Sequence, residues 1–108
     1  MKVSIAGIWD RGIHDKERIH LRADVALNLS FYVLLDTSEI GLNQISAGSL
    51  NAYWFPPKDL NRGDNVVVYS RGGSASSETR VDGSVWHFIF RGSQIPLDDV
   101  TFVIIKFS

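Results

Sequence analysis

The chain contains no cysteine among its 108 residues. Disulfide bridges, thiolate metal ligands and a cysteine nucleophile are therefore excluded together. Long apolar runs are also lacking, so no segment is predicted to span a bilayer. The apolar start of the chain is interrupted by Ser4 and Gly7 and meets charge at Asp10, which is unlike the core of a signal peptide. These absences lead us to expect a soluble, cytoplasmic protein that makes no use of a membrane.

The chain carries no excess of charge of one sign. Eleven Lys and Arg residues are set against twelve Asp and Glu residues, which gives a formal net charge of −1 at pH 7. Non-specific nucleic-acid binding depends on clustered cations that displace counterions from phosphates. The near-neutral balance therefore disfavours nucleic acid as a partner. With 44% apolar residues the chain has the composition of a globular protein, and its length predicts a single domain over residues 1–108.

Signals for helices are scarce, and signals for strands recur along the whole chain. Runs with alternating or β-branched apolar residues are separated by turn-forming residues, which is typical of an antiparallel sandwich. The sequence therefore predicts an all-β fold, an immunoglobulin-like antiparallel β-sandwich of about seven strands. Residues 36–50 can hold one short helical turn capped by Ser38, and residues 70–84 are predicted to form a long flexible hairpin loop. The expected strands are residues 2–9, 17–23, 29–37, 50–55, 65–71, 85–90 and 100–107.

One predicted strand holds a row of aromatic residues. Trp86, Phe88 and Phe90 occupy alternate positions in it, with His87 on the opposite side. Successive side chains of a strand point to opposite faces, so the three rings share one face. Burial of such a side chain stabilises a protein by roughly 1.5–3 kcal/mol relative to exposure, and a solvent-facing row would leave an adhesive patch. We therefore expect the aromatic row to face the core and His87 to lie at the outer surface or under a neighbouring element.

Candidate binding residues are sought on outward faces and beside turns. Ile19 and Leu21 alternate with cationic or ionisable side chains, which the pattern places on the outer face of their strand. Two tryptophans border turns, where a flat ring can serve as a platform for a sugar, although such rings also pack at the rim of a core. The last strand is apolar on both faces, so its second face is expected to be covered by the domain's own loops or by a second chain. The candidate binding residues are Trp9, Arg18, His20, Arg22, Trp54 and Phe107.

Patterns that carry chemistry are absent or weak. The histidines, at positions 14, 20 and 87, form no zinc-binding spacing, and a solvated surface residue is the plainer interpretation of His20. Composition does not exclude a Ser-His-Asp arrangement, but no Gly-x-Ser-x-Gly elbow and no phosphate-binding loop are present. Asp98 and Asp99 suit a solvated turn better than a calcium site, and Arg62-Gly63-Asp64 is interpreted as the turn before a strand. We therefore expect no catalytic residues, no metal, no cofactor and no enzymatic activity.

Several segments resemble the lamin tail domain family. In that family a strand that begins with Glu is followed by a short turn and by an aliphatic-Asn-Leu-Ser stretch that starts the next strand, a pattern found here in residues 17–36. Residues 55–73 resemble the family's middle strand with its Pro-and-Gly turn, and residues 85–92 and 98–107 resemble its aromatic and final strands. The chain departs from the pattern at positions 31 and 32, where Phe-Tyr replaces Gly-Trp or Gly-Tyr. The residues that carry the first pattern are Glu17, Ile19, Leu21, Val25, Leu27, Asn28, Leu29, Ser30, Tyr32, Leu34 and Asp36.

The resemblance implies an immunoglobulin-like sandwich that acts as a non-catalytic module for contacts with proteins and sometimes with nucleic acids. A fold alone does not determine a function. Together with the missing catalytic set, however, the resemblance leads us to expect a small binding or assembly module that acts through protein–protein contacts, either with a partner or by self-association. Two alternatives stay open: a carbohydrate-binding sandwich that uses exposed Trp, and a small enzyme subunit.

Overall fold

Strands dominate the fold. The computed structural model describes residues 2–10, 13, 15–39, 45–92 and 100–106, with side chains at 2–10, 13, 15–34 and 53–92. Within these residues it contains ten strands and one turn of 3-10 helix, η1 (Leu29–Phe31). The strands are β1 (Val3–Trp9), β2 (Arg18–Ala23), β3 (Leu27–Asn28), β4 (Tyr32–Glu39), β5 (Ile45–Trp54), β6 (Asp59–Leu60), β7 (Asn65–Tyr69), β8 (Ser76–Thr79), β9 (Val85–Phe90) and β10 (Val100–Lys106).

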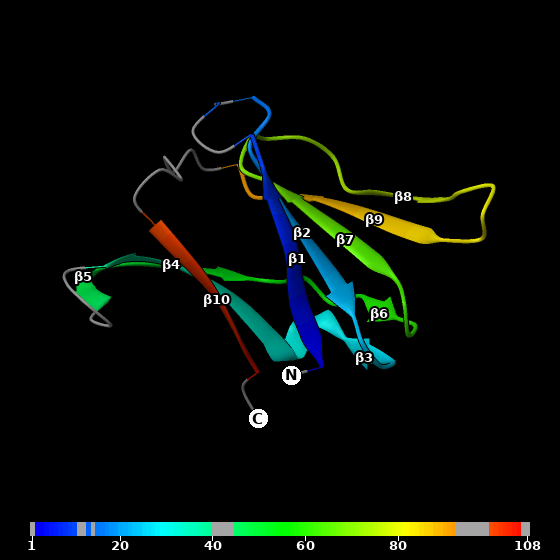
Figure 1. Cartoon of the computed structure of the whole chain (residues 1–108), viewed down its shortest axis with the longest axis horizontal. Helices are drawn as coiled ribbons and strands as arrows, with labels where there is room; N and C mark the ends of the chain where they lie inside the picture. The colour runs from blue at the N-terminus through cyan, green and yellow to red at the C-terminus, as the bar shows by residue number, and fades with distance from the viewer. Residues whose placement is uncertain (1, 11–12, 14, 40–44, 93–99, 107–108) are drawn as a thin grey trace.

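The described strands form two main sheets and one two-stranded ribbon (Figure 1). The larger sheet has five strands in the order β1-β2-β7-β9-β8, the second has three in the order β10-β4-β5, and β3 pairs with β6. The two main sheets lie as separate layers, and core residues come from both. The predicted all-β sandwich is therefore confirmed. One pair, β7 with β9, is parallel, whereas the sequence predicted only antiparallel pairs.

Each of the seven predicted strands overlaps a strand of the structure, and β3, β6 and β8 were not expected. The predicted loop of residues 70–84 contains β8, which pairs antiparallel with β9, so this part of the prediction was wrong. All four residues of β8 are exposed and none is apolar, so in the sequence this strand looks like a loop. The described part of residues 36–50 belongs to β4 and β5 and holds no helical turn. The 3-10 turn lies earlier, where the Asn28 side chain accepts a hydrogen bond from the Ser30 N–H at 2.9 Å.

The hydrophobic core lies between the five-stranded sheet and the other strands. Ile19 and Leu21 of β2 face inward, as the alternation predicted. Their partners across β7, Val68 and Val66, are buried beside them. Tyr32 enters the core from the start of β4, and burial raises the pKa of its hydroxyl. The core residues are Val3, Ile19, Leu21, Ala23, Leu29, Tyr32, Leu34, Phe55, Leu60, Val66, Val68 and Ile89.

The aromatic row of β9 does not face the core, so this prediction was wrong. β9 pairs in parallel with β7, and the register sets His87 beside Val66 and Ile89 beside Val68. Both valines are buried, and His87 and Ile89 are buried with them. The aromatic row therefore lies on the outer face of the sheet, where its three rings are half-buried. Because β9 has bulky apolar residues on both faces, alternation alone did not identify the inner one.

Candidate functional site

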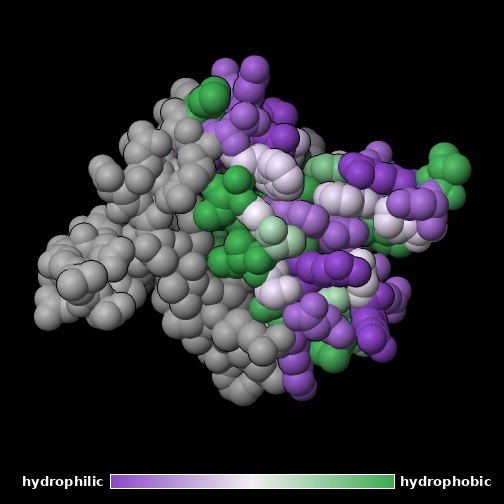
Figure 2. Space-filling model, in the orientation of Figure 1, coloured by the Kyte–Doolittle hydropathy of each residue, from purple (hydrophilic) through white to green (hydrophobic). Residues whose placement is uncertain are grey.

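The outer face of the five-stranded sheet gathers aromatic and cationic side chains. These residues lie on β1, β2, β7 and β9, apart from Arg80, which follows β8, and they line a shallow hollow of about 300 Å³. Figure 2 shows purple hydrophilic residues interspersed with paler ones over this part of the surface. We call this surface the aromatic–arginine face, and its residues are Trp9, Arg18, His20, Val67, Tyr69, Arg80, Trp86 and Phe88.

The Trp86 ring is the centre of this face. The His20 ring stacks on it with the centroids 4.9 Å apart and an interplanar angle of 22°. The guanidinium carbon of Arg80 lies 3.9 Å from the Trp86 ring centroid, within the range of a cation–π contact. His20 is held in turn by a 2.8 Å hydrogen bond between its Nε2 and the Asn65 Oδ1. The tryptophan ring is therefore held between His20 and Arg80, and Asn65 holds His20 in turn.

A second ring pair lies further along β7 and β9, beyond Phe88. Tyr69 and Phe90 stack with the centroids 5.0 Å apart and the rings within 10° of parallel. The guanidinium carbon of Arg71 lies 4.9 Å from the Tyr69 centroid and 5.1 Å from the Phe90 centroid. The backbone at Gly73 lies so close to the Phe90 ring that an added Cβ would be 2.6 Å from the Phe90 Cδ1. Glycine is therefore the residue that permits this approach of the backbone to the stack.

The structure brings together three of the six predicted binding residues. Trp9, Arg18 and His20 all belong to the aromatic–arginine face, and Trp9 is 51% exposed. Arg18 is oriented by Asp10, whose Oδ2 accepts a 2.6 Å hydrogen bond from the Arg18 Nη1. The other members of the face were missed. Sequence reasoning placed the aromatic row in the core and Arg80 in a loop, and only the outward alternation of β2 pointed to the correct side.

The other three predicted binding residues do not join this face. Arg22 lines a separate hollow beside the turn before β7. Trp54 lies on β5 in the other sheet, where it is 61% exposed. Phe107 lies outside the described residues, as do the side chains of the last strand that were predicted to be apolar on both faces.

The turn between β8 and β9 positions both Arg80 and Trp86. Gly83 has a φ of +86°, a left-handed conformation that favours glycine, and its N–H donates to the Arg80 carbonyl at 2.9 Å. The Ser84 hydroxyl accepts the indole N–H of Trp86 at 3.0 Å and donates to the Asp82 carboxylate at 2.6 Å. A short chain of hydrogen bonds therefore connects the tip of the hairpin to the central ring of the face.

The Asp82 carboxyl is expected to titrate below its ordinary pKa of 3.8. Hydrogen bonds from the Ser84 hydroxyl and backbone N–H lower this pKa, more than the charge of Arg80 does, because they favour the ionised form. The stability that they supply is present above pH 3.8 and is lost as the pH falls through the lower folded-state pKa. An NMR titration of the Asp82 carboxyl carbon measures the midpoint. Ser84→Ala should move the midpoint back toward 3.8, and a wild-type midpoint at or above 3.8 contradicts the assignment.

A polar chain lies on the inner side of β9, centred on a buried histidine. His87 Nε2 lies 3.2 Å from Asp64 Oδ2, and His87 Nδ1 lies 2.7 Å from Ser77 Oγ. Asp64 immediately precedes β7, and Ser77 lies on β8. Asp64 and His87 are buried, whereas Ser77 is exposed. The fold thus aligns a serine, a histidine and an aspartate that the sequence analysis had not connected. We refer to them as the Ser77–His87–Asp64 chain.

The Arg62-Gly63-Asp64 stretch forms the turn that the sequence predicted. Gly63 has a φ of +89°, and the Asp64 carboxylate accepts a 3.0 Å hydrogen bond from the Asn61 N–H. The carboxylate is buried and also contacts His87. Asp64 therefore belongs to the interior of the fold and is not displayed at the surface.

Across the described ranges, no three His, Asp or Glu side chains gather as the ligands of a metal ion do. The same part of the chain holds no helix of the length and apolarity needed to cross a membrane.

The fold and its outer surface define the class of protein, a small all-β sandwich that displays ordered aromatic and cationic side chains on one sheet. No protein-family model matches the chain, and no curated protein does. Function is therefore inferred from the geometry of the chain itself.

Proposed function

We propose that the chain is a small non-catalytic binding module that contacts a protein through the aromatic–arginine face. The observation that carries this proposal is the Trp86 ring, stacked with His20 and covered by Arg80 on a five-stranded sheet. Trp, Tyr and Arg are the residues that most often dominate the binding energy of protein interfaces. The rings are already held by their neighbours, so a partner orders few side chains on binding.

The charge of the surface favours an acidic partner. Arg18 and Arg80 are paired with Asp10 and Glu78, at 2.6 and 3.1 Å, and Arg71 adds a third guanidinium beside the face. Both ion pairs are partly exposed, so solvent weakens them and a carboxylate of a partner can compete for the same guanidinium groups. Complementary charge then steers the partner to this side of the sheet. An acidic peptide segment with one apolar side chain in the hollow fits these features.

The resemblance to the lamin tail domain supports the same kind of function, because that family is used for protein contacts. A second copy of this chain is the other form that the partner can take. The carboxylates on its own surface would then meet the guanidinium groups of the face. We propose a separate acidic protein as the principal partner because three guanidinium groups stand against two carboxylates here, which leaves a small positive excess that disfavours an identical face.

The test selects peptides from a random phage-displayed library on the immobilised full chain. The selected peptides are expected to be enriched in Asp and Glu and to carry an aromatic or aliphatic residue. A synthetic peptide of the selected sequence then gives the Kd by isothermal titration calorimetry. Trp86→Ala and Arg80→Ala should each weaken binding by roughly 30-fold, the factor that corresponds to a hot-spot residue.

Trp54→Ala is the matched control, since Trp54 is an exposed tryptophan on the other sheet. Its Kd should equal that of the wild type. Selected peptides without acidic enrichment, or an equal loss of affinity in Trp54→Ala, would overturn the proposal. Light scattering after size exclusion distinguishes the second form of partner: a dimer that Trp86→Ala converts to a monomer identifies a second copy as the occupant.

A carbohydrate-binding function is the second candidate, and the exposure of Trp54 favours it. This ring is 61% exposed and is followed by Phe55 and the Pro56-Pro57 pair, which stiffens the segment that carries it. A flat exposed ring suits the apolar face of a sugar. On a glycan array the wild type should then bind a glycan. Trp54→Ala should not bind that glycan, and Trp86→Ala should bind it as the wild type does.

A further inference from the structure

We propose that Ser77 is an activated nucleophile that accepts an acyl group from an activated ester or thioester, with His87 as its base and Asp64 as the residue that orients His87. This site lies on the inner side of β9, opposite the aromatic–arginine face, and goes beyond the proposed binding function. The inference concerns a single acylation of the protein, so it stands or falls separately from the peptide contact.

The direction of the hydrogen bonds follows from the chemistry of the carboxylate. A carboxylate oxygen only accepts hydrogen bonds, so the His87 Nε2 carries the hydrogen that it shares with Asp64. In the neutral imidazole Nδ1 is then an acceptor, and the Ser77 hydroxyl donates to it at 2.7 Å. This is the relation of nucleophile, base and orienting group found in serine hydrolases. In serine hydrolases the histidine Nε2 faces the serine and Nδ1 faces the aspartate, whereas here Nδ1 faces Ser77 and Nε2 faces Asp64.

The burial of the chain places the nucleophile at its accessible end. His87 and Asp64 are buried, and Asp64 is also fixed by its 3.0 Å hydrogen bond from the Asn61 N–H. The imidazole is therefore held by partners at both nitrogens. Ser77 is the exposed residue of the chain and lines a pocket, so it is the end of the chain that a reagent can approach.

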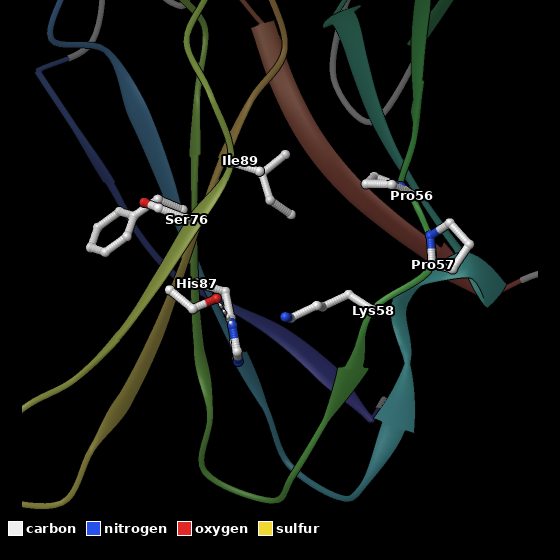
Figure 3. Close-up of a pocket in the computed structure, with 9 residues that line it drawn as sticks. Pro56, Pro57, Lys58, Ser76, His87 and Ile89 are labelled. Atoms are coloured by element: carbon white, nitrogen blue, oxygen red, sulfur yellow. Dashed lines mark hydrogen bonds between the residues drawn. The ribbon is translucent and has the colours of Figure 1, made fainter.

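A pocket of about 280 Å³ adjoins the serine and the histidine (Figure 3). Its apolar walls include Pro56, Pro57 and Ile89. This volume lies just under the ~300–1,000 Å³ of sites that hold drug-sized ligands, so it suits a short acyl chain. Lys58 lines the same pocket, and Figure 3 shows its side chain extending toward His87. Its positive charge is placed to stabilise the carbonyl oxygen that becomes negative during attack.

The proposed step is an acyl transfer. A bond forms between the Ser77 Oγ and the carbonyl carbon of the donor while the hydroxyl proton moves to the His87 Nδ1. The bond between that carbon and its leaving group breaks, and the leaving group departs with the electron pair. With p-nitrophenyl butyrate the products are butyryl-Ser77 and p-nitrophenolate. The imidazolium, which is paired with Asp64, then releases its proton to water.

The experiment incubates the full chain with p-nitrophenyl butyrate and follows the intact mass, and peptide mapping then locates the added group. One butyryl group on Ser77 is expected, and Ser77→Ala should lose it. Because Ser77 is exposed, this variant is expected to fold. Ser76→Ala is the matched control, since Ser76 is the neighbouring hydroxyl on the same strand and lines the same pocket. It should react at the wild-type rate.

His87→Gln tests the base. Loss of a positioned general base is expected to slow acylation of Ser77 by about a hundredfold. A folded Ser77→Ala protein that gains the same butyryl group, or a wild-type label found on Lys58 instead, overturns the proposal. So does a wild-type chain that gains no butyryl group on Ser77. If His87→Gln does not fold, the comparison of Ser77→Ala with Ser76→Ala decides the question by itself.

Discussion

Ile19→Ala is expected to lower the free energy of unfolding by about 2–5 kcal/mol. Ile19 is 1% exposed and lies on the inward face of β2, between Ile8 of β1 and Val68 of β7. Its truncation removes apolar contacts on both sides. The flanking strands are held by their backbone hydrogen bonds, so they do not close over the cavity that remains. Urea unfolding followed by tryptophan fluorescence should show a lower midpoint with an unchanged slope.

Ile13→Ala is the matched control because it deletes the same atoms at a site that is 51% exposed. Its stability should stay within about 0.5 kcal/mol of the wild type, as for most surface substitutions. Equal losses at Ile13 and Ile19 would mean that the cost does not come from burial. The inward orientation of β2 would then be incorrect, and with it the assignment of the opposite side of the sheet to binding.

Asp64→Ala is expected to destabilise the fold by about 2–4 kcal/mol, although it removes only a small polar side chain. The substitution deprives His87 of its carboxylate partner and leaves a polar group of the imidazole buried without one. An unsatisfied buried group of this kind costs about 1–3 kcal/mol. The turn before β7 also loses the hydrogen bond from the Asn61 N–H. Thermal unfolding followed by circular dichroism measures the combined effect.

Asp64→Asn separates hydrogen bonding from charge at the same position. The amide oxygen of asparagine can accept the hydrogen bonds from both His87 and the Asn61 N–H, so this variant should retain most of the stability that Asp64→Ala loses. If the two variants are equally destabilised, the hydrogen bonds do not account for the effect. A wild-type melting temperature in Asp64→Ala would remove the structural argument for the Ser77–His87–Asp64 chain altogether.

The sequence predicted the strands well where polar and apolar residues alternate strictly. In β2, Ile19 and Leu21 were assigned to the core and Arg18 and His20 to the outer face, and the structure places them on those faces. His20 is not the solvated residue that was expected, because it is half-buried under the stacked Trp86 ring. Prediction failed in β9, where both faces carry bulky apolar or aromatic residues. The inner face of β9 is set by its register with β7. Because the two strands are parallel and β8 lies between them in the sequence, no short stretch of sequence reveals that they pair.

The site was harder to predict than the fold because its members are distant in sequence. Trp9, Arg18 and His20 were identified from outward alternation and a bordering turn. Trp86 and Arg80 join them only through the order of strands in the sheet. The same holds for the Ser77–His87–Asp64 chain. Asp64 and His87 lie 23 residues apart and meet because β7 pairs with β9.

The two outer strands of the five-stranded sheet determine how two copies of this chain can meet. At one end β1 has a register shift between Ile5 and Gly7, and such an irregularity spoils the straight row of hydrogen-bonding groups that another strand needs. At the other end β8 is only four residues long, fully exposed, and carries Glu78. Short charged borders of this kind discourage edge-to-edge growth into fibres. Self-association by strands added at the borders of this sheet is therefore not expected, and a partner reaches the sheet across its outer face.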